Sequence, residues 1–290
     1  MERLIYKNAL GQEIEFSNDS HYKWIQVDDL GSAEAIFQTA SSPYQDGTTS
    51  AGQAYFKSKA IKIDLVISST DTQADIRTLN NILNPKIGLA SLTLEKNGIT
   101  RVLNKVRTRV MPSLLGGASR GFTFQHSSII FEVFDPFYTD EEYTEVEILT
   151  GDNTFNFPLE ISTSYVFDYV NSLGVVIDNT GDVDCPITVI LDGPKNSPLT
   201  IENITTGEKI VLSMALLEEE KLTITTEIDN INAIKANINT GIETVAFQYI
   251  DITQTTFFNL SRGENTIRIT TGESEVEEAT IKYKQRYVGI

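Results

Sequence analysis

Side chains able to perform acid–base, nucleophilic or metal chemistry are few and scattered in this sequence. It contains two histidines, His21 and His126, and one cysteine, Cys185. Two isolated histidines offer little for a general base or a histidine-rich metal site, and a single thiol excludes an internal disulfide or a cysteine-rich zinc site. We therefore expect both histidines to be structural and Cys185 to be a small buried side chain beside Pro186.

Acidic side chains are abundant, but their spacing matches no defined site. Glycoside hydrolysis needs two carboxylates that face each other in a cleft, an arrangement that a sequence cannot show. Asp178, Asp182 and Asp184 could suggest calcium, but the EF-hand spacing and its bidentate glutamate are absent, which favours a polar turn. The glycines of 111–121 lack the Gly-Lys-Ser or Gly-Lys-Thr of a phosphate loop. The sequence thus predicts no enzyme, no catalytic residue, no metal and no cofactor.

The charge balance excludes ordinary nucleic-acid binding. The formal net charge is −17, with 40 acidic and 23 basic side chains, whereas nucleic-acid binding needs basic patches that neutralise phosphates. No apolar run approaches the length of a transmembrane span, and the first residues lack the features of a secretory signal. We expect a protein that is made in a cytoplasm and inserts into no membrane.

A basic stripe on one predicted strand is the candidate binding feature. Asn97-Gly98 is the preferred pair for a two-residue hairpin turn and predicts a hairpin over 92–110. On the returning strand, alternation places four basic side chains on one face, with Leu103 among them: Arg101, Lys105, Arg107 and Arg109. The other face carries Val102, Val106 and Val110. The stripe is either a solvated face or a subunit interface that meets the acidic surface of a neighbouring copy.

The remaining pattern predicts a mainly β chain. Short alternating segments between turn residues are typical of antiparallel sheets, and they recur at 4–16, 22–27, 60–67, 92–110, 122–134, 175–181, 186–193, 199–203, 221–226 and 266–270. In the second half they indicate a sandwich or jelly roll. Residues 214–220 could form a short helix or a loop with one turn.

One helix is predicted in the first half, starting at Asp71 or Thr72 as its cap and stopping before Pro85. Its apolar face, at spacings of three and four, consists of Ile76, Leu79 and Leu83. Residues 41–52 form a polar loop before the strand 60–67. Residues 111–121 form a glycine-rich loop, for which a flexible arm that reaches a partner is the functional interpretation.

Four segments, taken in order, resemble the distal tail proteins of siphophages. Residues 4–16 look like the opening hairpin of that family, and Gln45-Asp46-Gly47 like its polar loop before a long strand. Residues 131–138 are similar to its crossing between two domains. The ending is similar as well, with Gly263-Glu264-Asn265 and a final strand-like stretch over 281–290. Because chain ends normally fray, a strand pattern that continues to the last residue suggests that something holds it.

The resemblance implies a structural protein of a phage or prophage tail, located at the tail tip or baseplate of the virion. Residues 1–138 would be an N-terminal ring-forming domain, β-sandwich-like with one α-helix and a β-hairpin. Residues 139–290 would be a C-terminal antiparallel, galectin-like or jelly-roll β-sandwich. Six copies would form a ring, with acidic side chains toward its lumen, that joins the tail tube protein to tail-tip, tail-associated or receptor-binding proteins.

A carbohydrate-binding, lectin-like protein that recognises the host surface is the alternative. Sugar sites usually need an exposed aromatic platform, and the second half has no tryptophan. Six other aromatic side chains could stack on a sugar, although most are expected to fill the core: Tyr165, Tyr169, Phe247, Tyr249, Phe257 and Phe258. The chain also has no insertion large enough for an extra carbohydrate-binding domain, which favours the structural role.

Overall fold

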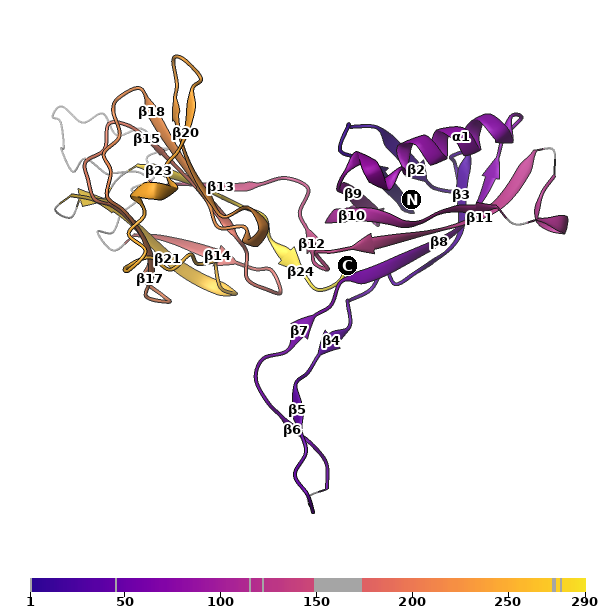
Figure 1. Ribbon diagram of the computed structural model, residues 1–290, viewed down its shortest axis with the longest axis horizontal. Coiled ribbons are helices and arrows are strands. Elements are labelled where there is room, and N and C mark those ends of the chain that lie inside the picture. Colours follow the sequence, from indigo (N-terminus) through magenta and orange to yellow (C-terminus); the bar gives the residue numbers. More distant parts are fainter. Residues whose placement is uncertain are drawn as a thin grey trace, which may run out of the picture. The chain divides into compact units, whose positions relative to one another are not determined.

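Figure 1 shows the computed structural model, which describes residues 2–44, 46–114, 116–121, 123–148, 174–272, 275–276 and 278–290. The chain divides into two compact units, Met1–Glu141 with Arg286–Ile290, and Glu142–Gln285. The second unit is therefore an insertion in the first, whereas the predicted division at 138/139 places 286–290 in the C-terminal domain. The fold is mainly β, with one α-helix in the described ranges, which confirms the predicted class.

Seven strands of the first unit close into a barrel. Neighbours in the order β11-β8-β3-β2-β1-β9-β10 are hydrogen bonded, and β10 also pairs with β11. β10 can serve both neighbours because it is 16 residues long and its register shifts at bulges, which bend a strand. The sheet thus closes on itself where a sandwich-like arrangement was expected. The strands are β1 (Glu2–Lys7), β2 (Glu13–Phe16), β3 (Tyr22–Asp28), β8 (Lys59–Ser68), β9 (Ala90–Lys96), β10 (Ile99–Leu114) and β11 (Phe124–Val133).

Aromatic side chains fill the barrel. The ring of Tyr6 stacks on that of Phe131 with centroids 5.1 Å apart, and Phe16 meets Phe131 edge-on at 6.4 Å. Helix α1 (Thr72–Ile82) starts where predicted, since Asp71 Oδ1 accepts the N–H of Ala74 at 3.1 Å. A 3-10 turn, Pro85–Ile87, follows it. The apolar face of the helix is buried as expected, through Ile76, Leu79 and Leu83.

The two hairpins predicted in this unit are confirmed. Asn97 and Gly98, between β9 and β10, have φ values of 53° and 81°, as a type I′ turn requires. In the turn between β1 and β2, Asn8 Oδ1 accepts the N–H groups of Leu10 and Gln12, each at 3.0 Å. Both turns use residues that tolerate or locally stabilise a tight reversal.

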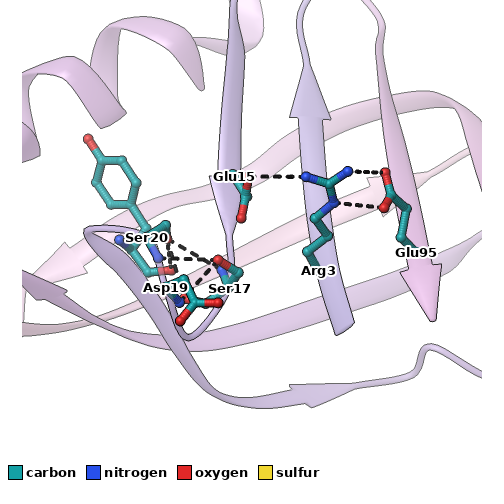
Figure 2. Close-up of polar contacts among 7 residues, drawn as sticks. Arg3, Glu15, Ser17, Asp19, Ser20 and Glu95 are labelled. Carbon is teal, nitrogen blue, oxygen red and sulfur yellow. Dashed lines mark hydrogen bonds and ion pairs between the residues drawn. The ribbon is translucent and has the colours of Figure 1, made fainter. Parts of the chain in front are cut away.

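Charges on the outer face of β2, β1 and β9 are matched across strands. Figure 2 shows the guanidinium of Arg3 between two carboxylates, with Nε 2.7 Å from Glu95 and Nη1 3.7 Å from Glu15. The same figure shows the turn after β2, in which Ser17 Oγ accepts the N–H of Ser20 at 3.2 Å. This part of the barrel exterior therefore presents paired rather than uncompensated charge.

A two-stranded arm, residues 31–58, projects from the barrel between β3 and β8 (Figure 1). It consists of β4 (Ala35–Ile36) paired with β7 (Tyr55–Phe56), and of β5 (Thr39–Ala40) paired with β6 (Thr49–Ser50). The predicted polar loop 41–52 is the outer end of this arm. The other predicted loop, 111–121, contains the end of β10 and a 3-10 turn, Gly117–Ser119.

The final strand of the chain is held, as its sequence suggested. β12 (Tyr138–Thr139) pairs with β10, and β24 (Arg286–Tyr287) pairs with β12 at the edge of the same sheet. The first unit is thus built from both ends of the described chain.

The second unit is a sandwich of two antiparallel sheets around one apolar core, as predicted. Cys185 is fully buried in that core, which confirms its expected place. Residues 214–220 form a turn rather than a helix, and two 3-10 turns, Ile228–Asn230 and Phe247–Tyr249, lie elsewhere. One sheet contains β13 (Thr144–Ile148), β23 (Ala279–Tyr283), β15 (Ile187–Asp192), β18 (Glu220–Thr225), β19 (Asn232–Asn237) and β20 (Glu243–Val245); the other contains β14 (Val175–Asn179), β21 (Gly263–Thr271), β16 (Leu199–Asn203), β17 (Glu208–Leu212) and β22 (Glu275–Val276).

Candidate subunit interface

A bulge interrupts the strand that carries the predicted basic stripe. Leu103 pairs with Leu92 and Val106 with Ala90, so β10 has one more residue than β9 in this interval. Lys105 lies within the interval and has a φ of 57°, in the left-handed region. Leu103 and Val106 are both buried in the barrel core although three positions separate them. The alternation expected of an unbroken strand therefore reverses at this point.

The four basic side chains consequently do not share one face, which corrects the predicted stripe. Arg101, two positions before the inward-facing Leu103, lies on the inward side of β10. Arg107, directly after the buried Val106, lies on the outward side and is exposed. A second register shift follows Thr108, and Val110, predicted to share a face with Val106, is 38% exposed.

Arg101 is engaged within the first unit. Its Nη1 lies 2.7 Å from Asp140 Oδ1, and its guanidinium carbon lies 3.9 Å from the centroid of the Tyr287 ring. The hydroxyl of Tyr287 in turn lies 3.4 Å from the other oxygen of Asp140. These contacts make Arg101 a bridge from β10 to Asp140, the residue after β12, and to Tyr287 on β24.

Arg107 and Arg109 lie on the outward face of β10, beside the return of the arm. Arg109 Nη1 is 3.3 Å from Glu132 Oε2, and the other oxygen of Glu132 accepts the hydroxyl of Ser58, the last arm residue, at 2.9 Å. In the pairing of β10 with β11, the backbone of Arg107 lies opposite that of Glu132, but the Arg107 side chain makes no ion pair with any residue that the structure describes. This exposed side chain is the part of the predicted stripe that is available to a partner.

The arm presents apolar and aromatic side chains without a core of its own. Phe37 is 62% exposed, Tyr55 is 59% exposed, and Tyr44 near the tip is fully exposed. Only Asp46 is charged between Ala35 and Phe56. An isolated two-stranded hairpin is at best marginally stable in water. The arm is therefore a surface suited to being covered by a partner.

Both ends of the arm are anchored where it joins the barrel. The hydroxyl of Tyr138 donates to the carbonyl of Leu30 at 2.5 Å, and Nζ of Lys59 donates to the carbonyl of Gly31 at 2.9 Å. The ammonium of Lys59 also lies 4.1 Å from the centroid of the Tyr138 ring. One step further along the arm, the ring of Phe56 packs edge-on against that of Phe137, with centroids 5.4 Å apart.

Burial shapes the electrostatics of this anchor. Only 7% of Lys59 is exposed, and this burial lowers the pKa of its ammonium to about 8, an effect that the nearby Asp29 carboxylate partly offsets. Burial likewise raises the pKa of Tyr138, so its hydroxyl remains a donor. Asp29 itself has a φ of 65°, a conformation that aspartate tolerates and that redirects the chain into the arm.

The arm is the feature that the sequence interpretation missed. Its signal was the lack of charge over 35–56, where the chain average of 22% charged residues leads one to expect about five. The local pattern of short polar and aromatic residues predicted a loop, because β4 to β7 are each only two residues long.

The residues considered for chemistry are dispersed. His21 is exposed, with Nδ1 3.6 Å from Asp75, and His126 packs edge-on against Phe124. Within the described ranges, no three side chains of histidine, cysteine, aspartate or glutamate gather in a way that could hold a metal ion. No helix in the same ranges is long and apolar enough to cross a membrane.

The aromatic side chains proposed to stack on sugars divide by burial. Phe258 is buried, and Phe257 packs against the core of the second unit. Phe247 and Tyr249 are 42% and 40% exposed, and the ring of Phe247 stacks on that of Phe257 with centroids 5.8 Å apart. The remaining two candidates, Tyr165 and Tyr169, lie outside the described residues.

Comparison with known families confirms the resemblance seen in the sequence. Residues 180–287 match the model of a family described as the C-terminal domain of a siphovirus-type tail component. No curated protein matches the chain by sequence.

Three solved phage structures share the fold over the whole chain. The crystal structure of the Dit protein of phage SPP1, described as a paradigm of the hub of adsorption apparatuses in phages that infect Gram-positive bacteria, superposes with a TM-score of 0.69, covering 99% of each chain at 11% identity. Chains of the phage p2 baseplate in its activated conformation superpose over 100% of both chains at 12% identity, with TM-scores of 0.63 for the calcium form and 0.61 for the strontium form.

Proposed function

We propose that this protein is the distal tail protein of a siphophage or prophage, a structural hub that forms a hexameric ring between the tail tube and the tail-tip or baseplate adsorption apparatus. The observation that carries the proposal is the combination of a C-terminal family match with a fold shared along the whole chain with a phage hub protein. Its partners would be five further copies, the tail tube protein, and tail-tip, tail-associated or receptor-binding proteins. It would be made in the host cytoplasm and would need no catalytic site, cofactor or nucleic-acid sequence.

Self-association of so acidic a chain requires a surface where copies do not repel each other. The arm provides one, since it combines exposed aromatic side chains with a single charge between Ala35 and Phe56. Burying such side chains against a neighbour would supply the apolar area that the arm lacks by itself. We therefore assign the main subunit contact to the arm.

Arg107 and Arg109 would contribute orientation rather than most of the affinity. Both are exposed, and they lie on the barrel face next to Glu132, which binds the end of the arm through Ser58. Arg109 is already paired with Glu132, so Arg107 supplies the uncompensated positive charge, which on a chain of net charge −17 would attract an acidic surface of the next copy. Arg101, which is paired inside the first unit, would act only by holding the final strand, and Lys105 by shaping the bulge.

The mass and shape of the purified protein test this proposal. We expect light scattering to give a hexamer and negative-stain images to show six-fold rings with an open centre. Replacing residues 35–56 by a short glycine-serine linker would abolish the rings and leave the barrel folded. Changing Arg107 and Arg109 together to glutamate would weaken ring formation, and Lys23→Glu, an exposed charge reversal on β3, serves as the matched control.

Three outcomes would count against parts of the proposal. A protein that remains monomeric both alone and with isolated tail tubes would contradict the ring. Rings that survive loss of the arm would keep the hub and reject the assigned contact. Rings unaffected by the double arginine substitution would reject the electrostatic contribution alone.

A lectin-like function of the second unit is a second proposal, favoured by the exposed Phe247 stacked on Phe257 with Tyr249 two residues further on. Selective binding on a glycan array, lost in Phe247→Ala and Tyr249→Ala but kept in Tyr143→Ala, would support it. Binding that is absent from the array and from calorimetry would remove it.

A further inference from the structure

Because the arm is long, a small change in its direction at the base moves its tip by a large distance. Each of its two sides contains about 14 residues, which extend over at most roughly 45 Å at about 3.3 Å per residue. A change of about 10° in its direction at the base would therefore move the tip by about 8 Å. A contact made by the tip depends on how firmly the base is held.

Two side chains from different parts of the first unit hold that base. Tyr138, on β12, binds the carbonyl of Leu30 just before the arm begins, and Lys59, at the start of β8, binds the carbonyl of Gly31, its first residue. Both side chains are buried and they contact each other, because the Lys59 ammonium lies over the Tyr138 ring. The segment that leads into the arm, Leu30-Gly31, and the residue that follows it, Lys59, are thus held together through Tyr138.

Barrel stability does not explain a lysine at this position. Removing an ammonium from water is costly, and a buried methionine of similar length would avoid that cost while filling the same space. The lowered pKa of Lys59 reflects the cost. What the ammonium adds, and methionine cannot, is a hydrogen bond to the backbone of the arm and attraction to the Tyr138 ring.

We propose that Lys59 and Tyr138 are positioning residues, which fix the direction in which the arm leaves the barrel so that the arm reaches a second copy of this chain. The claim that the arm reaches a second copy rests on the proposed function, which assigns the subunit contact to the arm. The claim that Lys59 and Tyr138 fix the direction of the arm concerns the isolated chain and stands by itself.

Three full-length variants separate the anchor from general stability. Tyr138→Phe removes only the hydroxyl that binds Leu30, and Lys59→Met removes the ammonium with little change in length. Lys57→Met is the matched control, because Lys57 is an exposed lysine on the arm whose ion pair with Glu34, at 3.1 Å, lies outside the anchor. The direction of the arm is measured by electron spin resonance between nitroxides at Asp46→Cys and Lys96→Cys, in a Cys185→Ala background and at a concentration where the chain is monomeric.

We expect a narrow distance distribution in the parent protein and in Lys57→Met, and a distribution about twice as wide in the two anchor variants. Loss of one charge-assisted or buried hydrogen bond corresponds to roughly a tenfold change in an equilibrium, so the concentration at which rings form should rise roughly tenfold. Lys59→Met should also raise the unfolding midpoint of the barrel, which would show that a wider distribution is not the result of damage to the fold.

The outcomes distinguish the two halves of the inference. Narrow distributions in both anchor variants, with the barrel intact, would overturn the assignment of positioning residues. Wide distributions with unchanged ring formation would overturn the connection to assembly. If the parent protein forms no ring with or without tail tubes, the proposed function fails, and the spin-label distances still decide whether Lys59 and Tyr138 set the direction of the arm.

Discussion

Arg286 and Asp135 form an ion pair across 151 positions of sequence, in which one guanidinium nitrogen lies 2.6 and 2.7 Å from the two carboxylate oxygens. The side chains are only 14% and 17% exposed, and the guanidinium lies 4.6 Å from the centroid of the Phe137 ring. The pair fastens β24 to the rest of the first unit, next to the contact between Arg101 and Tyr287.

Arg286→Met is expected to lower the free energy of unfolding of the first unit by about 2 kcal/mol, because it leaves the Asp135 carboxylate without its partner in a mostly buried place. Trp24, the single tryptophan, lies in the first unit and packs against its core, so its fluorescence in urea reports this unit. Lys7→Met, in the same unit, removes an exposed pair with Glu13 and should leave the stability of that unit nearly unchanged. Equal effects of the two substitutions would contradict the importance of the Arg286 pair.

The stability of the first unit should depend on pH through Lys59. Its pKa falls from an ordinary lysine value of about 10.5 in the unfolded chain to about 8 in the folded one. The unfolded state therefore binds more protons between these values, so the free energy of unfolding rises with pH from about 8 to about 10.5 and is insensitive to this group below about 8. Lys59→Met should raise the free energy of unfolding of the first unit by about 2 kcal/mol at pH 7, and this increase should shrink toward pH 10. A difference between variant and parent that does not vary with pH would contradict the shift.

Asn265 should be essential to the second unit. It is fully buried, its Oδ1 accepts the N–H and hydroxyl of Ser261 at 3.0 and 2.9 Å, and its Nδ2 donates to the carbonyls of Ser261 and Gly263. Asn265→Ala should destabilise the unit by about 3 kcal/mol, since several buried groups lose their partner. Faster hydrogen exchange in β16 and β21 would report the loss. Glu264→Ala, at the exposed neighbouring position, should leave exchange unchanged, and similar effects at both positions would refute the prediction.

Ser127 offers the opposite case. Its hydroxyl is buried on β11 and has no hydrogen-bond partner among the described residues. Ser127→Ala should therefore leave the first unit as stable as before, or stabilise it by up to about 1 kcal/mol. The comparison is Thr139→Val, which removes a buried hydroxyl that donates to the carbonyl of Val102 at 3.2 Å and should cost about 1 kcal/mol. Trp24 fluorescence serves both variants, and a loss at Ser127 equal to that at Thr139 would show that the serine hydroxyl has a partner.

Local signals in the sequence predicted local structure well. The Asn97-Gly98 turn, the cap at Asp71 with the buried face of α1, and the strands of the second unit all depend on residues close together in the chain. Periodicity and turn chemistry act over that range, so they could be read directly. The burial of Cys185 followed from residue type in the same way.

The features that decide the candidate interface depend on distant parts of the chain. Nothing in the local sequence marks the bulge at Lys105, because lysine has no preference for a positive φ, and the bulge forms where β10 leaves β9 and joins β11. The anchor of Lys59 on Gly31 and the closure of the barrel likewise join segments that periodicity cannot relate.

The insertion of one unit into the other affects the order of events during synthesis. Residues 142–285 are all translated before Arg286–Ile290, so the inserted sandwich can fold while the barrel still lacks β24. A chain released early by the ribosome would leave Asp135, Arg101 and Asp140 without the partners that the final strand supplies. The fold thus makes the completion of the first unit depend on residues that are translated only after the whole inserted sandwich.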